Sequence, residues 1–295
     1  MRHGLTTLRQ AVVAALALSV FVASTARPAS APTRIVSTSP SITETLFALG
    51  LGDRVVGVSR FCRFPPEVAE IPKVGTFLKP DAERIAALRP DLVVVHEVSD
   101  GVDRRLAALR IPSIVVDRGT MASVFSSIRQ IASATGVPTR GDALIADIQR
   151  RLDVVRRAGG RTARPRVLFI IGRRPGSLAD LVAVGPGSYL NELIDIAGGI
   201  NVMAIDGQPE YPRISMETVL RFDPDVIVDT VDMGETDAER SARGPVNEQL
   251  WSTYRNLTAV RTKRLHAATT DALVVPGPRV VEAAEWIAAL LHSRR

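Results

Sequence analysis

Cysteine is almost absent from this chain, because Cys62 is the only one among 295 residues. A single thiol cannot close a disulfide within the chain, so stability must come from buried cores. An isolated cysteine is more often a small buried apolar side chain than a reactive group. We therefore assign Cys62 no chemistry.

Aromatic residues and basic runs are also scarce. Phe, Trp and Tyr together make up 4% of the chain, and no extended run of lysine and arginine occurs. Proteins that bind nucleic acid combine basic stretches that follow phosphates with rings that stack on bases. Nucleic acid is therefore not an expected partner.

Long apolar runs are limited to one, "AVVAALALSVFV" at 11–22, a twelve-residue core that follows Arg2 and Arg9. Small residues come next, with possible cleavage after Ala26 or Ala31. A membrane-spanning helix needs about 20 apolar residues, so this core is too short. The order of basic, apolar and small residues predicts a secretory signal over 1–31 that is removed, and no membrane insertion.

The alternative for this segment, a buried N-terminal helix, would rarely show that order. No Cys lies near the expected cleavage sites, which excludes a lipid anchor there. Removal takes away Arg2, Arg9 and Arg27 and lowers the formal net charge from +6 to +3. The mature protein is thus expected to be exported, soluble and mildly basic.

Catalytic signatures are missing as well. The chain has no G-x-S-x-G elbow, no G-x-x-x-x-G-K-[ST] loop and no H-E-x-x-H helix. Its four histidines do not cluster, so no metal site is expected. We predict a protein that is not an enzyme and holds no cofactor. The competing hypothesis is a two-lobed chelatase-like enzyme, for which His96 with Glu97 is the obvious acid–base pair.

What the chain does contain is an alternation of short apolar runs with helical patterns, which indicates an α/β fold. Strands are expected at 35–37, 55–58, 92–95 and 114–116, then at 167–171, 201–204, 226–229 and 272–275. Helices are expected at 41–49, 81–88, 102–109, 190–197 and 215–221.

A repeated pattern divides these elements into two halves. "FLKPDAERIAALRPDLVVV" at 77–95 and "PRISMETVLRFDPDVIV" at 212–228 each contain a capping residue, Asp81 or Ser215. A glutamate follows two places on, and a Pro-Asp pair and a β-branched run come later. The stretches 41–58 and 188–204 also match, each opening on a capping serine. The order predicts two lobes of one architecture, 34–137 and 161–295.

A single amphipathic helix over 138–160 separates the lobes. Leu144, Ile145, Ile148, Leu152 and Val155 fall on one face, with charged residues opposite. A helix of this length measures about 30 Å, enough to run along two small lobes. One stiff connection leaves little freedom for a wide hinge. A further helix is expected at 275–291, after a Pro-Gly-Pro break.

The candidate ligand residues follow the strands, because ligands of open α/β sheets bind beyond the carboxyl ends of the strands. Rings can cover the faces of a large ligand while Arg guanidinium groups hold its oxygens. Each residue also has a structural alternative, such as a solvated loop pair for the two adjacent arginines. The candidates are Ser39, Arg60, Phe61, Phe77, His96, Arg173, Arg174 and Tyr211.

Several stretches resemble a known family. They are "RIVSTSPSITETLFALGLGDRVVGVS", "FPPEVAEIPKVGTF", "ERIAALRPDLVVV" and "PGPRVVEAAEWIA", together with the single spanning helix. They are similar to the iron-chelate/vitamin B12 periplasmic-binding proteins, the substrate-binding subunits of type II ABC importers. The resemblance covers about 34–291 and implies two Rossmann-like lobes joined by one long backbone helix. It further implies a periplasmic monomer that delivers a metal chelate to a permease dimer with its ATPase.

The resemblance also implies roles for individual residues. Glu83 and Glu217 match the carboxylates on the lobe surfaces that pair with permease arginines. An acid on a first helical turn also stabilises the helix by about 0.3–1 kcal/mol, which is a sufficient structural reason for both. Phe77 matches an aromatic residue that packs on the corrin, and His96 stands where those relatives tend to have Trp. His96 is thus a departure from those relatives, whereas the match at Phe77 makes a corrinoid the expected ligand.

Two other ligand classes remain open by the same resemblance. A ferric siderophore would use an arginine pocket, for which Arg60, Arg173 and Arg174 are available. Haem would need a tyrosine ligand, and only Tyr189 and Tyr211 are plausible. A binding protein that serves a sensor instead of a permease is also possible on these residues.

Overall fold

The structure is a computed structural model that describes residues 31–97, 99, 101–160, 163–230, 245, 248–268 and 270–293. Residues 32–295 form one compact unit. The predicted signal segment, apart from Ala31, lies outside the described residues. No helix in the described ranges is long and apolar enough to cross a membrane.

The first lobe is built on a parallel sheet in the order β2-β1-β3-β4. All five residues of β3 are buried, as is typical of a parallel strand covered on both faces. The expected strands are confirmed with ends shifted by at most one residue. The strands are β1 (Ile35–Ser37), β2 (Val55–Val58), β3 (Leu92–His96) and β4 (Ser113–Val116).

Four α-helices accompany this sheet, one of which, α5, the sequence did not predict. α2 begins one residue earlier than expected because Ser39 caps it and Pro40 occupies the first turn. Ser41, the expected cap, lies inside the helix. The helices are α2 (Pro40–Ala48), α3 (Ala82–Ala87), α4 (Val102–Ala108) and α5 (Met121–Ala134), with the short 3₁₀ turns η1 (Gly52–Arg54) and η2 (Pro66–Glu70).

The second lobe has a mixed sheet in the order β10-β9-β5-β6-β8, and β7 pairs with β5. β10, β9, β5 and β7 run parallel, whereas β6 is antiparallel to both β5 and β8. The strands are β5 (Arg166–Gly172), β6 (Leu181–Ala183), β7 (Ile200–Asn201), β8 (Arg213–Ile214), β9 (Val226–Thr230) and β10 (Leu265–Ala268). The helices are α7 (Tyr189–Ile196), α8 (Met216–Phe222), α10 (Thr258–Arg261), η3 (Asp271–Leu273) and α11 (Val280–His292).

Two strand predictions in this lobe are wrong. Residues 201–204 contribute only Asn201 to β7, because its side-chain oxygen accepts a hydrogen bond from the Met203 amide and turns the chain. Residues 272–275 begin in the 3₁₀ turn η3 instead of a strand, since Thr270 caps that turn by accepting from the Ala272 amide. The last strand of the sheet is β10, which the sequence did not predict.

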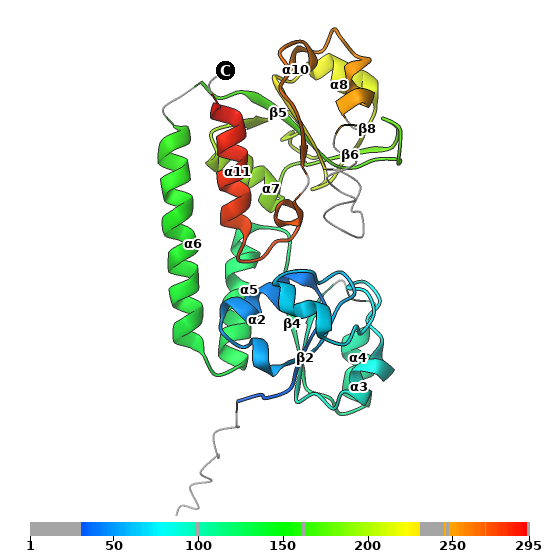
Figure 1. Ribbon diagram of the computed structural model, residues 1–295, viewed down its shortest axis with the longest axis vertical. Coiled ribbons are helices and arrows are strands. Elements are labelled where there is room, and N and C mark those ends of the chain that lie inside the picture. Colours follow the sequence, from blue (N-terminus) through cyan, green and yellow to red (C-terminus); the bar gives the residue numbers. More distant parts are fainter. Residues whose placement is uncertain are drawn as a thin grey trace, which may run out of the picture. The chain divides into compact units, whose positions relative to one another are not determined.

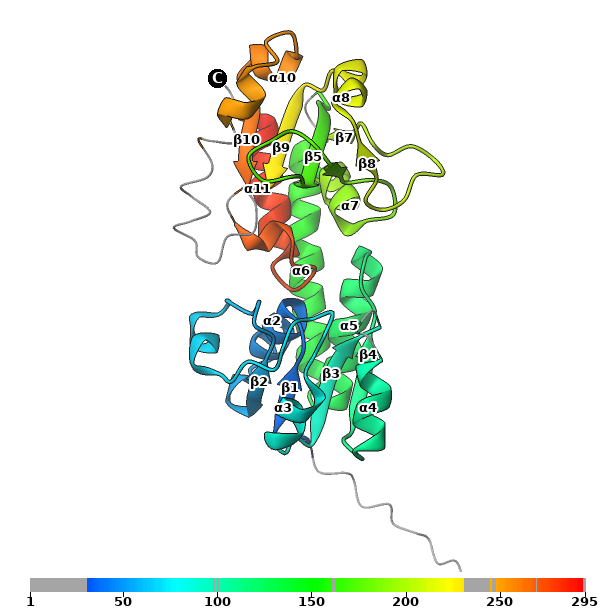
Figure 2. The same ribbon diagram turned by 90° about the vertical axis from the view of Figure 1, so that its right-hand side faces the viewer.

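The predicted interlobe helix is confirmed as α6 (Pro138–Gly159), 22 residues long, or about 33 Å. Figures 1 and 2 show it running alongside both lobes. It packs against α5 of the first lobe and against α7 and α11 of the second. Ile145, Ile148, Leu152 and Val155 are buried as predicted.

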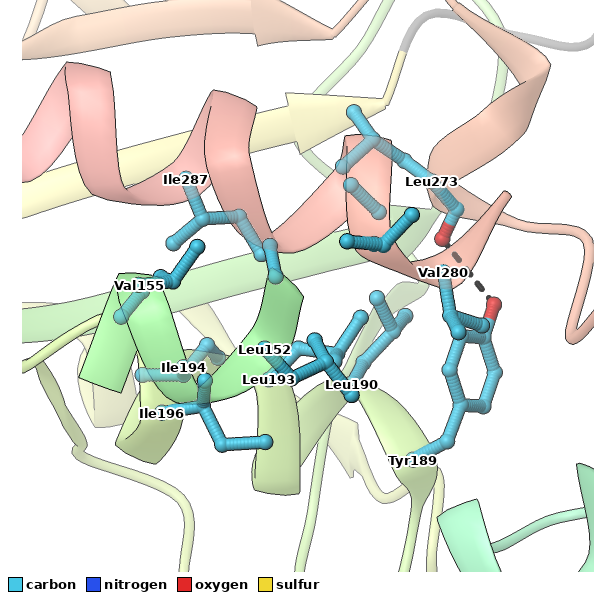
Figure 3. Packing of buried hydrophobic residues seen from close by; sticks show 14 of the residues in the cluster. Leu152, Val155, Tyr189, Leu190, Leu193, Ile194, Ile196, Leu273, Val280 and Ile287 are labelled. Atoms are coloured by element: carbon cyan, nitrogen blue, oxygen red, sulfur yellow. Dashed lines mark hydrogen bonds between the residues drawn. The ribbon is translucent and has the colours of Figure 1, made fainter. Parts of the chain in front are cut away.

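One hydrophobic core joins α5 and α6 to the second lobe. The buried side chains of α6 share a cluster with Met121 and Val124 of α5 and with residues of α7 and α11. Figure 3 shows this packing, in which the Tyr189 hydroxyl donates a hydrogen bond to the Leu273 carbonyl at 3.0 Å. The helical connection is therefore supported along its length by side-chain packing, which favours a limited change of lobe orientation.

Candidate ligand-binding site

A cavity of about 370 Å³ lies at the carboxyl ends of the parallel strands of the first lobe. This is the edge at which ligands of open α/β sheets bind. The 271–276 segment of the second lobe, which precedes α11, closes its other side. Its lining consists of Ser39, Pro40, Ser41, Phe61, Arg63, Phe77, His96 and Arg118 from the first lobe and Asp271, Val274, Val275 and Pro276 from the second.

The structure brings four of the eight predicted ligand residues to this cavity: Ser39, Phe61, Phe77 and His96. Phe61 is 42% exposed and Phe77 is half-buried, so both rings are accessible to a ligand. Arg60 is exposed beside them, with its guanidinium carbon 5.4 Å from the centre of the Phe61 ring. Arg60 therefore supports a cavity ring without lining the cavity itself.

The other three predicted residues, Arg173, Arg174 and Tyr211, belong to the second lobe and do not line the cavity. The Arg173 side chain is only 6% exposed, and its Nε donates to Asp229 Oδ2 at 3.0 Å. Arg174 is exposed and pairs with Asp180 at 2.8 Å. Tyr211 is half-buried, and burial raises the pKa of its phenol to about 12.

The Arg173–Asp229 pair is an internal feature of the second lobe. Asp229 also accepts a hydrogen bond from Trp251 Nε1 at 2.7 Å, and Trp251 is fully buried. Burial raises the pKa of Asp229, although Trp251 and Arg173 oppose that effect. The arrangement gives the Arg173 guanidinium a local structural partner.

His96 is held as a neutral imidazole at the wall of the cavity. Its Nδ1 lies 3.1 Å from the Val116 carbonyl oxygen, which can only accept, so Nδ1 carries the proton. Nε2 then accepts from the Ser41 hydroxyl at 3.0 Å. Burial lowers the pKa of His96, which is 6% exposed. Both ring nitrogens thus have protein partners, while Glu97 beside it is exposed.

The hydroxyl groups at the start of α2 are ordered by the same network. Ser39 accepts from the Ile42 amide as the helix cap, and its hydroxyl lies 3.2 Å from that of Ser41. This leaves Ser41 to reach His96. Ser39 and Ser41 therefore contribute hydroxyl groups to the cavity wall, with Ser41 next to His96.

Two cavity arginines, Arg63 and Arg118, were not predicted from the sequence. Both follow strands, since Arg63 comes five residues after β2 and Arg118 two residues after β4. The rule that identified Arg60 and His96 could therefore have found them. The segment 274–276 was missed because it was assigned to a strand.

A buried ion-pair network joins the lobes directly beneath the cavity. Arg279, at the start of α11, donates from Nε to Glu44 Oε2 of α2 at 2.9 Å and from Nη2 to Glu44 Oε1 at 2.5 Å. Nη2 also reaches Asp271 at 3.0 Å. The guanidinium carbon lies 4.2 Å from the centre of the Phe64 ring. Glu44 is 4% exposed, so this bridge is almost dry.

Burial raises the pKa of Glu44 from 4.5 to about 7, against the opposing effect of Arg279. The folded protein thus binds a proton more tightly at Glu44 than the unfolded chain does, and stability falls as pH rises from about 4.5 to 7. Arg279 and Asp271 face the carboxyl group, and Glu282 lies close enough to affect its pKa.

We expect the stability of the wild type relative to Glu44→Gln to depend on pH. The difference between their free energies of unfolding should decrease by up to about 3 kcal/mol between pH 4.5 and 7.5. The difference isolates Glu44 because glutamine keeps the shape but does not titrate. Urea unfolding at several pH values measures it. A difference that is constant with pH would contradict the raised pKa.

The predicted docking carboxylates occupy matching places on the two lobes. Glu83 is the second residue of α3, and Asp81 caps that helix by accepting from the Glu83 and Arg84 amides. Glu217 is the second residue of α8, which Ser215 caps by accepting from the Thr218 amide. Both glutamates are exposed. The caps and the repeated helix-strand order are confirmed.

A larger cavity, of about 580 Å³, lies at the amino ends of β5 and β9 in the second sheet. It is lined by Arg164, Asp225 and Arg264, among others, and by none of the predicted ligand residues. Amino ends of strands are not where α/β folds bind their ligands. Among the described residues no group of three His, Cys, Asp or Glu side chains could hold a metal ion. The interlobe cavity is therefore the candidate site.

Comparison with known proteins identifies the family to which this two-lobed chain belongs. The Periplasmic binding protein family matches residues 35–272. The chain belongs to this family. Its relatives include a cobalamin-binding protein of Halobacterium salinarum, 31% identical over 90% of this chain and 70% of the relative. An uncharacterized ABC transporter substrate-binding lipoprotein of Bacillus subtilis is 29% identical over 88% of this chain and 80% of the relative.

Among solved structures, the periplasmic haem-binding protein RhuT from Roseiflexus sp. RS-1 in its apo form matches with a TM-score of 0.76. It is 29% identical, and the match covers 88% of this chain and 97% of that one. The predicted fold class, two α/β lobes joined by a long helix, is confirmed. The expected resemblance to the iron-chelate and vitamin B12 group of periplasmic-binding proteins is confirmed as well, and this group consists of substrate-binding proteins.

Proposed function

We propose that the protein is a periplasmic solute receptor that captures a corrinoid and delivers it to an ABC importer. The observation that carries this proposal is the cavity at the strand ends, which both lobes line and which exposes two phenylalanine rings. Such rings suit the face of a large flat ligand. The cobalamin-binding relative supports the corrinoid.

The chemistry of the cavity supports binding over catalysis. His96, the candidate general base, is neutral, and its two ring nitrogens already contact Val116 and Ser41. Glu97 is exposed next to it and does not line the cavity. A general base must reach the proton that it removes. Since Glu97 does not line the cavity, the His96–Glu97 pair is not assembled there, and a chelatase-like reaction that uses this pair is not favoured.

Haem is the second candidate ligand because the RhuT structure has the same fold. The two tyrosines that could coordinate haem iron are placed unfavourably. Tyr189 is buried in the core, where its hydroxyl donates a hydrogen bond to the Leu273 carbonyl. Tyr211 does not line the cavity. A ferric siderophore remains an alternative, although Arg173 and Arg174 have carboxylate partners within the second lobe.

Titration of the purified protein with cyanocobalamin, haemin and ferric siderophores tests the proposal. We expect cyanocobalamin to quench the protein fluorescence at one-to-one stoichiometry. Phe77→Ala should raise its Kd by about tenfold, since an aromatic contact is worth about 0.5–1.5 kcal/mol beyond its buried area. Val154→Ala, an exposed change on α6, should not alter Kd.

The outcomes of this titration separate the alternatives. Binding of haemin or a siderophore alone would replace the corrinoid with that ligand. Binding that Phe77→Ala leaves unchanged would place the ligand elsewhere. Failure of every chelate to bind would overturn the receptor assignment.

Transport is the second part of the proposal. Glu83 and Glu217 are proposed as the carboxylates that dock the two lobes on a permease dimer, whose two-fold symmetry they would match. Their exposure on the first turns of α3 and α8 supports this role. Exposed ion pairs contribute about 0.2–1 kcal/mol each, so they would orient the receptor more than hold it.

A further inference from the structure

Arg63 is a charged residue of the cavity wall with one buried donor that the described residues leave unused. It lies in the loop between β2 and η2 and lines the cavity. Its Nη1 atom is buried without a hydrogen-bond partner in the described part of the chain. Buried donors of native proteins nearly always have a partner, and a donor without one needs an explanation. Arg63 therefore contributes a positive charge to the cavity wall without using all of its donors within the described protein.

Arg118 is the second cavity arginine, and no described residue is its counter-ion. It follows β4, is exposed and lines the same cavity. No hydrogen bond or ion pair of its side chain occurs within the described ranges. Glu210 of the second lobe lies beside the neighbouring Gly119, yet it forms no ion pair with Arg118. Arg118 therefore keeps its charge available on the cavity side.

The other charges of the site do not neutralise these two. Asp271 is the only carboxylate in the described lining, and Arg279 engages it at 3.0 Å. Arg279 also holds Glu44, whose burial already favours the protonated form. His96 is neutral. The cavity thus presents two available positive charges next to the Phe61 and Phe77 rings.

We propose that Arg63 and Arg118 form an anion subsite that binds acidic oxygen groups at the edge of the ligand while Phe61 and Phe77 contact its face. The inference rests on the proposed function and adds the charge of the ligand to it. Guanidinium groups match carboxylates and phosphates, with two parallel N–H donors for two oxygens. The acidic group is a carboxylate of a haem-like or siderophore-like chelate, or the phosphate of a cobalamin.

Paired ligands that differ in the acidic group test this subsite. The pairs are haemin with its dimethyl ester and cyanocobalamin with dicyanocobinamide, which lacks the phosphate and its nucleotide. In the pair that binds, we expect the Kd of the acidic member to be about 10- to 100-fold lower than that of the neutral member, because charge-assisted hydrogen bonds contribute a free energy of this size. Raising the salt concentration should weaken the acidic member more than the neutral one.

Variants of the two arginines show whether they cause that difference. Arg63→Gln and Arg118→Gln should each reduce the preference for the acidic member about tenfold and leave the neutral member nearly unaffected. Arg63→Lys should retain part of the preference because the charge remains. Arg157→Gln, an exposed change on α6, is the matched control. Circular dichroism of each variant confirms that it is folded.

The results distinguish this inference from the proposed function. If a chelate binds and both members of its pair bind equally well, the anion subsite is wrong and the receptor assignment stands. The anion subsite is also wrong if the preference persists in both glutamine variants. If no member of either pair and no ferric siderophore binds, the receptor assignment fails, and the subsite fails with it.

Discussion

Replacement of Arg279 with alanine should lower the free energy of unfolding by about 3–5 kcal/mol, because the buried Glu44 carboxyl group loses its partner and must take up a proton. Glu44 is 3% exposed in its side chain, and it has bidentate contact with Arg279 alone. Removing the guanidinium also removes its stacking on Phe64. Chemical denaturation at pH 7.5 measures the loss.

Arg151→Ala is the matched control for this prediction. Arg151 also pairs with a glutamate, Glu285, at 2.8 Å, but both side chains are about two-fifths exposed. Exposed pairs contribute about 0.2–1 kcal/mol, so this variant should lose little stability. Adding Glu44→Gln to Arg279→Ala should recover part of the loss, because glutamine needs neither a cation nor a proton at this buried position. Equal losses in Arg151→Ala and Arg279→Ala would show that the buried Arg279–Glu44 pair, the interlobe bridge, stabilises the protein no more than an exposed ion pair.

The interlobe bridge opposes a wide separation of the two lobes. Arg279 and Glu44 connect α11 to α2, and the Tyr189 amide donates to the Gly119 carbonyl at 2.6 Å nearby. The shared core of α5, α6 and the second lobe adds apolar packing to these polar contacts. Wide separation of the lobes would break a buried ion pair and expose that core. Ligand entry with a small change of lobe orientation is the less costly route.

The elements that the sequence predicts well are those whose local pattern agrees with their environment. β3 and β9 are β-branched runs that are buried throughout, and α6 has one apolar stripe facing two helix layers. The missed strand β10 reads "LHAA", with no β-branched residue. It becomes a strand because β9 offers a parallel edge next to it. Pairing between distant segments is not visible in a local pattern.

The candidate site shows the same division. Position at or just after the end of a strand selected Ser39, Phe61 and His96, and all three line the cavity because parallel strands end at one edge. The same rule selected Arg173, because the local pattern does not reveal that Asp229, 56 residues further along the chain, accepts a hydrogen bond from it. Extended to five residues after β2, the same rule would also have selected Arg63, which lines the cavity. Which arginine is paired and which is available depends on tertiary contacts.

Charge reversal at both Glu83 and Glu217 should abolish import while ligand binding survives. Each glutamate lies on the first turn of a capped helix, and the two helices belong to different lobes (Figure 1). A positive side chain at each place would meet permease arginines with repulsion instead of attraction. Uptake of the chelate identified by titration, in cells that contain only the variant receptor, measures the effect. Kd of the purified variant checks that binding is intact.

The helix dipole gives a competing explanation of any loss, because a positive charge on a first turn destabilises a helix by about 0.3–1 kcal/mol. Asp103→Arg is the control, since Asp103 also occupies the first turn of its helix, α4. It carries the penalty of one such substitution but alters a different surface. Loss of uptake in both this control and the glutamate variant would assign it to folding. Normal uptake in Glu83→Arg with Glu217→Arg would remove the docking role and leave the two glutamates as helix-stabilising residues.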